Sequence, residues 1–239
     1  MRGPYSEYAA PPVYVYPEPT GPRPGVRFTR QELFQLAVAI LALSGALTLA
    51  NYMGARASFF TAGDLLIVVP IWFVSSLIAV GTGVGLHEIA HKVVAQRSGH
   101  WAEFRYSLRG LALAFFFAFF GFLFGAPGAT WISGYVTPEQ NGRISAAGPV
   151  SNLVIATMFM LAATALAPAS FLNPWAYLLT AMFRFVWYLN VVLAGFNMIP
   201  VMPLDGAKVW AWNKAAWIGI VATAAALYIV GYFSGLLSF

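Results

Sequence analysis

The chain lacks cysteine and carries very little charge. None of its 239 residues is Cys, so it cannot form a disulfide framework or a thiolate metal site. Any metal must therefore be held by His, Asp or Glu. Charged residues make up 9% of the chain, against roughly 25% in soluble globular domains, and 60% of its residues are hydrophobic. With a mean hydropathy of +0.73 the chain cannot cover a water-facing surface, so we expect it to reside in the lipid bilayer.

A change in composition along the chain separates a tail from a membrane domain. Residues 1–28 are rich in Pro and Tyr, and we interpret them as a disordered cytoplasmic tail. Residues 29–239 form the predicted transmembrane domain. Thr29 and Glu32 have the spacing of a capping box, which predicts that a helix begins there. The net charge of +5 does not indicate a nucleic-acid partner, because basic residues of membrane proteins more often mark the cytoplasmic face.

Long charge-free stretches predict the membrane spans. A span needs about 20 apolar residues. Pro168 and the Asn-Pro-Trp turn at 173–175 divide a stretch that is too long for one helix. The sequence therefore predicts spans near 33–55, 65–86, 145–167, 175–199 and 215–239. The apolar part of 110–138 is short and carries glycine, so it either crosses the membrane or returns to the same side.

The distribution of positive charge favours the second alternative. If 111–126 does not cross, all of the 13 Lys and Arg residues except Arg56 and Arg184 lie on the cytoplasmic side with the tail. We therefore predict an all-α polytopic membrane protein. It has about five full transmembrane helices, one re-entrant or interfacial element, and a short β-hairpin near 128–142.

A metal-binding pattern follows the second predicted span. In His87-Glu88-Ile89-Ala90-His91 the two histidines are four residues apart, so a helix places both imidazoles on one face, where they can bind one metal ion. Glu88 lies beside the first ligand, within reach of a water at that metal. Ionisable residues within apolar spans are rare and usually functional. An ordinary solvated helix end is the alternative interpretation.

Asp205 is the candidate for a third ligand. A catalytic zinc site with two His needs one more protein ligand and leaves a fourth position for water. Asp205 follows a long uncharged stretch and lies in a Pro- and Gly-rich segment, although a solvated turn is an alternative. It reaches the side of His91 only if an even number of crossings separates the two residues. A non-crossing 111–126 satisfies that condition, in agreement with the charge distribution.

Three motifs in this order resemble the site-2 protease family of intramembrane zinc metalloproteases. They are HExxH on a transmembrane helix, GPVSN (148–152) opening a later helix, and NMIPVMPLDG (197–206) near the end of the next. The resemblance covers about residues 65–215 and is closest to compact prokaryotic members without a PDZ domain. It implies one Zn²⁺ ion held by His87, His91 and Asp205, with Glu88 as the catalytic acid/base.

The resemblance also implies the surroundings of the reaction. Asn152 and Asn197 match family asparagines that are expected near the scissile bond, where an amide would assist catalysis. The alternative is a buried amide that pairs with backbone groups at the helix start after Pro149 or near Pro200. The substrate is expected to be a transmembrane segment of another protein, cut in or at the edge of the bilayer, in a prokaryotic plasma membrane with the active site toward the cytoplasm. Residues 129–137 are rich in β-branched and aromatic side chains and are a candidate edge strand for an unwound substrate, or else an ordered loop.

Two rival interpretations remain. A prenyl-protein-processing metalloprotease would use a glutamate as its third ligand, but beyond Glu88 the chain has only Glu103 and Glu139, both in polar connecting segments. A metal-binding scaffold without activity is the other rival. The presence of Glu88 beside both histidines and Asp205 gives that reading no support.

Overall fold

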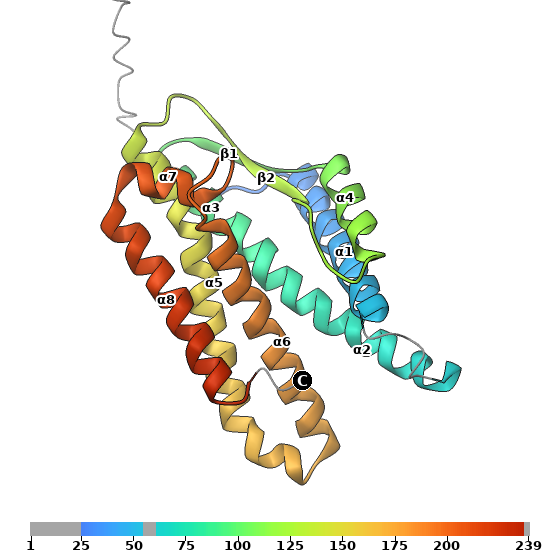
Figure 1. Cartoon of the computed structure of the whole chain (residues 1–239). Coiled ribbons are helices and arrows are strands. Elements are labelled where there is room, and N and C mark those ends of the chain that lie inside the picture. The colour runs from blue at the N-terminus through green and yellow to red at the C-terminus, as the bar shows by residue number, and fades with distance from the viewer. Residues whose placement is uncertain (1–24, 55–60, 237–239) are drawn as a thin grey trace, which may run out of the picture.

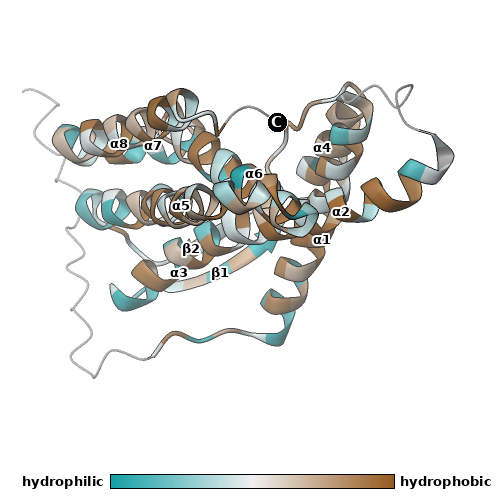
Figure 2. Cartoon of the chain, turned by 90° about the horizontal axis from the view of Figure 1, so that it is seen from below, coloured by the Kyte–Doolittle hydropathy of each residue, from teal (hydrophilic) through white to brown (hydrophobic). Residues whose placement is uncertain are grey.

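Five long helices make up most of the protein (Figure 1). The computed structural model describes residues 25–54 and 61–236. The five helices long and apolar enough to span a membrane are 30–54, 63–97, 138–171, 174–197 and 214–233. Their bounds confirm the five predicted spans, although the second and third are longer than expected. Hydrophobic residues dominate these helices (Figure 2), and the protein is a multi-pass membrane protein.

These spans are assembled from the following elements: α1 (Arg30–Gly54), α2 (Ala62–Val80), the π-helical turn η2 (Gly81–Leu86), α3 (His87–Arg97), α5 (Pro138–Leu166), η3 (Ala167–Phe171), α6 (Pro174–Asn197) and α8 (Lys214–Phe233). The short helix α7 (Asp205–Trp212) joins α6 to α8. Between α3 and α5 lie β1 (Trp101–Tyr106), α4 (Leu108–Ala118) and β2 (Gly128–Ser133).

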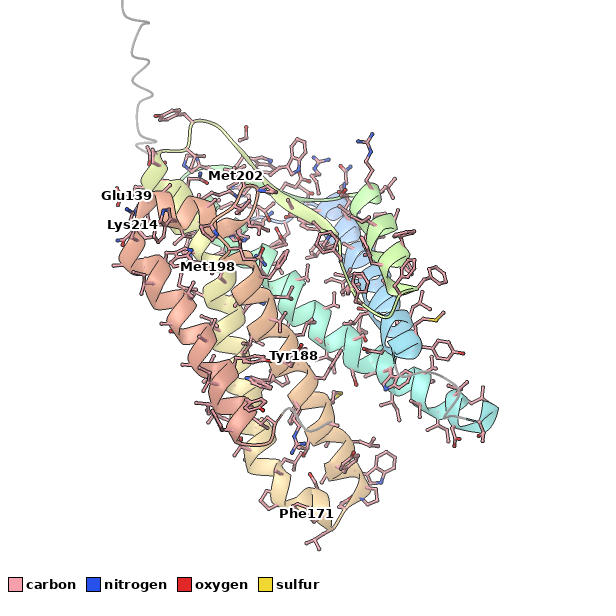
Figure 3. The ribbon with its side chains drawn as sticks, viewed as in Figure 1. Glu139, Phe171, Tyr188, Met198, Met202 and Lys214 are labelled. Carbon is pink, nitrogen blue, oxygen red and sulfur yellow. The ribbon has the colours of Figure 1, made fainter. Side chains whose placement is uncertain are left out.

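One end of the helix bundle collects the start of α1, the end of α3, the start of α5, the end of α6 and α7. The backbone N–H of Arg27 donates to Gln96, which ties the chain before α1 to the end of α3. The indole of Trp217 in α8 donates to the carbonyl of Met198 just after α6. Figure 3 shows Glu139 and Lys214 at this end and Phe171 at the opposite end. We call it the motif end, because it carries His87, His91 and Asp205.

The segment between α3 and α5 does not cross to the other end. Helix α4 has 11 residues, about 16 Å of helix, which is too short for a hydrocarbon core of about 30 Å. Its flanking strands β1 and β2 pair antiparallel, with Trp101 opposite Ser133 and Tyr106 opposite Gly128. The predicted non-crossing element is therefore confirmed. The strand near 129–137 is also present, but its partner is β1, and residues 138–142 begin α5 rather than complete a hairpin.

Helix α5 begins earlier than predicted. Thr137 caps its N-terminus, because its hydroxyl accepts from the backbone N–H of Gln140 while the Gln140 side chain accepts from the N–H of Thr137. Pro138 occupies the first turn, where its missing N–H costs nothing. Pro149 therefore lies inside the helix, and GPVSN does not open it. The Thr-x-x-Gln capping signal at 137–140 marks the true start.

The predicted capping box at the start of α1 is only half present. The hydroxyl of Thr29 accepts from the backbone N–H of Glu32, but the Glu32 carboxylate turns inward. It forms a buried ion pair with Lys92 of α3 and accepts from the backbone N–H of Phe104 in β1. Both side chains of the pair are 1% exposed. This pair ties α1, α3 and β1 together beside the histidine motif.

Candidate metal centre

A single long helix carries both histidines toward the motif end. Residues 63–97 run through α2, η2 and α3 without a break. The π-helical turn Gly81–Leu86 lies directly before His87, and the extra residue in such a turn changes the direction in which the following side chains point. His87 and His91 then occupy successive turns of α3, and both are buried.

Three ligand atoms converge at this point. The Nε2 atoms of His87 and His91 are 2.9 Å apart. Asp205 Oδ2 lies 3.3 Å from His87 Nε2 and 3.1 Å from His91 Nε2. Two ligands of a tetrahedral zinc ion with bonds of about 2.0–2.1 Å are roughly 3.3–3.4 Å apart. The triangle is close to the size that one such ion requires, and Asp205 meets the histidine pair as the even-crossing argument requires.

Hydrogen bonds at the far side of each imidazole favour metal binding. His91 Nδ1 lies 2.7 Å from the carbonyl oxygen of Ile144, and His87 Nδ1 lies against Asn152 Oδ1. A carbonyl oxygen can only accept, so the proton of each neutral imidazole resides on Nδ1. Both Nε2 lone pairs and a carboxylate oxygen then face one another. Such a donor set is stable when a cation lies among the three atoms, so these residues fit a zinc ion.

Asp205 is prepared for this role by its surroundings. Burial alone would raise the pKa of its carboxyl, but when no metal is bound and the imidazoles of His87 and His91 are protonated at Nε2 as well, their hydrogen bonds and charge outweigh burial and lower that pKa below its usual range. Lys208, one turn along α7, lies 3.7 Å from the other carboxylate oxygen. Asp205 is thus held as a carboxylate at neutral pH.

Two glycines allow the elements to approach this closely. A Cβ atom on Gly148 of α5 would lie 2.5 Å from the Nε2 atoms of both His87 and His91. A Cβ on Gly206 would lie 2.2 Å from the carbonyl oxygen of Met198. Gly148 lets α5 pass directly beside the Nε2 atoms of the imidazoles, and Gly206 lets the start of α7 pack on the end of α6. Neither role was predicted from the sequence.

Glu88 lies beside the three ligand atoms and is held by β2. The backbone N–H and the hydroxyl of Thr130 both donate to Glu88 Oε2 at 2.8 Å. His87, Glu88 and His91 offer ligand atoms that all lie within 4.8 Å of one another. The carboxylate is therefore at the site, but it has its own partners on the strand, in contrast to Asp205.

The two predicted asparagines lie in different surroundings. Asn152 is fully buried behind His87, where its Oδ1 faces His87 Nδ1 and its Nδ2 donates to Gly83 and Asn190. These contacts place its amide between His87, Gly83 and Asn190, and its expected place near the scissile bond stays a prediction. Asn197 is half-buried near the end of α6 and donates to the carbonyl of Leu193, one turn earlier. Its expected role near the scissile bond stays a prediction.

The glutamates that a rival interpretation would need are engaged elsewhere. Glu103 in β1 accepts from the Thr29 hydroxyl and pairs with Arg105. Glu139 forms an exposed ion pair with Arg143 in the first turns of α5. Within the described ranges, neither belongs to a group that could hold a metal ion. The geometry thus favours Asp205 over Glu103 and Glu139 as the third ligand.

Fold and site together define a polytopic membrane protein in which two histidines and a carboxylate converge at a candidate metal centre. The chain is 36% identical over 208 residues to "Putative zinc metalloprotease MJ0611" of Methanocaldococcus jannaschii, which covers 85% of this chain and 97% of that protein. It is also 32% identical over 135 residues to "Putative zinc metalloprotease Rip3" of Mycobacterium tuberculosis, over 54% of this chain and 28% of that protein. The chain belongs to this zinc metalloprotease family. No family model and no solved structure matches it.

Proposed function

We propose that the protein is an intramembrane zinc endopeptidase of the site-2 protease type, which cleaves transmembrane segments of other membrane proteins. The observation that carries the proposal is the approach of Asp205 Oδ2 to within 3.1–3.3 Å of two imidazoles at the end of an apolar spanning helix. A hydrolytic site carried by an apolar spanning helix is suited to a substrate that is itself embedded in the membrane.

In this mechanism His87, His91 and Asp205 hold the zinc ion. When bound, zinc lowers the pKa of a coordinated water and polarises the substrate carbonyl. Glu88 accepts the proton of the attacking water on its carboxylate and then transfers it to the leaving amine. The Thr130 N–H and hydroxyl keep the Glu88 carboxylate oriented between the ligand atoms and β2.

The outer edge of β2 supports a role in substrate binding. In β1, the backbone N–H groups of Phe104 and Tyr106 donate to side chains of α1, so these N–H groups point away from β2. Their partners Thr130 and Gly128 must likewise point their backbone groups away from β1. Thr130 points toward Glu88. A transmembrane helix must unwind before water can attack it, and an added strand along this edge would satisfy its backbone next to the proposed base.

The substitution Glu88→Gln tests the proposal. The purified variant is expected to retain zinc, because Glu88 is not among the three converging ligands, and to lose cleavage of a membrane-anchored reporter. Asp205→Ala is the companion variant and is expected to lose both zinc and cleavage. Persistent cleavage by Glu88→Gln would show that another group is the base. Full zinc occupancy in Asp205→Ala would refute the assignment of the third ligand.

We further propose that the motif end faces the cytoplasm of a prokaryotic cell. Most of the basic residues lie there, including Arg27, Arg97, Arg109 and Lys208. Cytoplasmic loops carry an excess of Lys and Arg in membrane proteins. A single cysteine introduced at the exposed Glu139 should be labelled by membrane-impermeant thiol reagents only after the cells are opened. Labelling in intact cells would reverse the orientation.

A further inference from the structure

A chain of buried amide groups connects α6 to the first histidine. Asn190, in the middle of α6, is fully buried, and its Oδ1 accepts from Asn152 Nδ2 at 2.9 Å. Its own Nδ2 donates to the carbonyl of Val186 at 2.9 Å and to the hydroxyl of Thr82 at 3.1 Å. Asn152 in turn faces His87 Nδ1. The chain thus joins the π-helical turn, α6 and α5 to one imidazole.

The direction of every hydrogen bond in this chain is determined. The Val186 carbonyl can only accept, so the NH₂ group of Asn190 must face it and the Asn190 oxygen must face Asn152. The Thr82 hydroxyl donates to the carbonyl of Ile78, so it accepts from Asn190. At Asn152, the carbonyl of Gly83 and the oxygen of Asn190 both accept from Nδ2, at 2.8 and 2.9 Å. Only the Asn152 oxygen is left for His87.

We infer that Asn190 is a positioning residue that fixes the tautomer of His87 through Asn152. The inference rests on the proposed metal site, which it deepens. With the Asn152 oxygen facing it, His87 Nδ1 must carry the proton, and the Nε2 lone pair is free for a metal ion. Asn190 supplies one of the two acceptors that hold the Asn152 amide in this orientation.

Removing Asn190 would weaken this selection. A rotated Asn152 amide presents its NH₂ group to His87 Nδ1, which favours the Nε2–H tautomer and blocks the ligand atom. Only the repulsion between the Asn152 oxygen and the Gly83 carbonyl would then oppose the rotation. The Gly83 carbonyl belongs to the π-helical turn before His87, so the turn and α6 act on the same amide.

The first test measures the tautomer itself. The chain has three histidines, so ¹⁵N-histidine labelling of the full-length, metal-free protein gives three imidazoles to assign by NMR at pH 8. We expect His87 to be Nδ1–H in the wild type and a mixture of tautomers in Asn190→Leu, which keeps the shape of the side chain but removes its oxygen.

The second test measures zinc affinity by chelator competition. Loss of an outer partner of a metal-bound histidine typically weakens binding 10–100-fold. We expect about tenfold weaker binding for Asn190→Leu and a larger loss for Asn152→Leu. The double variant should bind no more weakly than Asn152→Leu, because Asn190 acts through Asn152. The control Thr180→Val removes a buried hydroxyl on the same helix, bonded to Ser170, and should leave zinc affinity unchanged.

These measurements separate the role inferred for Asn190 from the proposed function. If folded Asn190→Leu matches the wild type in both tautomer and zinc affinity, the inference is overturned. Additive losses in the double variant would equally overturn it, since they would place Asn190 outside the Asn152 pathway. If Asn190→Leu does not fold, Asn190→Ala replaces it under the same criteria. A wild-type protein without zinc affinity would refute the proposed function, while the tautomer measurement would still decide whether Asn190 orients His87 through Asn152.

Discussion

Replacing Gly148 with alanine should remove zinc binding without unfolding the protein. The added Cβ would lie 2.5 Å from His87 Nε2 and from His91 Nε2, whereas ordinary contact begins at 3.4 Å. The difference, 3.4 − 2.5, means that the imidazoles or α5 must move by about 0.9 Å. Metal–ligand distances tolerate only about 0.2 Å. At least one ligand should be lost, and affinity should fall by more than the roughly 100-fold upper range for an outer partner.

The matched control is Gly195→Ala in α6. Among the described residues, no heavy atom outside the local backbone of α6 lies within 4 Å of a Cβ at that position, so the same substitution in a helix is accommodated there. Alanine is better than glycine in a helix interior by about 1 kcal/mol, so both variants gain helix propensity. Zinc content after dialysis and competition, together with circular dichroism, distinguishes the two. Wild-type zinc affinity in folded Gly148→Ala would refute the packing argument.

Three further predictions concern the supports of the site. Glu32→Ala should destabilise the protein by about 3–5 kcal/mol, because it leaves Lys92 charged, buried and without its ion-pair partner. Thermal unfolding of Glu32→Ala, compared with that of a Glu32→Leu/Lys92→Met double variant, measures how much of the loss is due to the unpaired charge of Lys92. Thr130→Val removes the hydroxyl donor to Glu88 but keeps the backbone donor, so cleavage should fall about tenfold while zinc binding stays the same; equal loss of zinc would contradict it. Hydrogen bonding from Thr29 and the charge of Arg105 lower the pKa of Glu103 in the folded protein. The ionised Glu103 carboxylate therefore stabilises the fold at a pH above the pKa that this group has in the unfolded chain. This stabilisation is lost as the pH falls through the lower pKa of the folded protein. Unfolding of Glu103→Gln should therefore depend less on pH below about 5 than that of the wild type.

Much of the architecture could be read from one-dimensional patterns. Spans were predictable because a bilayer demands about 20 apolar residues per helix, and charge distribution excluded a crossing at 111–126. The end of α5 followed from Pro168 and the start of α6 from Asn173 and Pro174. The start of α5 differs from the prediction, because the charge-free stretch begins only after Arg143 while the capping signal at 137–140 precedes it.

The metal centre was predictable to the level of its ligands. His87 and His91 share a helical face by spacing alone, and the number of crossings brings Asp205 to the same end. The contacts of Asn152 were not predictable, because a motif identifies a residue but not the direction in which its amide points. Lys92, which looked like one more basic residue at a helix end, is buried against Glu32, a contact between residues 60 positions apart.

The sequence by itself determined that this protein resides in a lipid bilayer, how many spans it has and which residues can bind a metal. These properties follow from composition and from spacing along single helices. Only the tertiary structure decided which atoms support that centre. Gly148 beside the Nε2 atoms, Asn190 next to Asn152 and Thr130 on Glu88 come from three different elements. Their contacts depend on how helices and a strand pack against one another, and no local pattern in the chain encodes that packing.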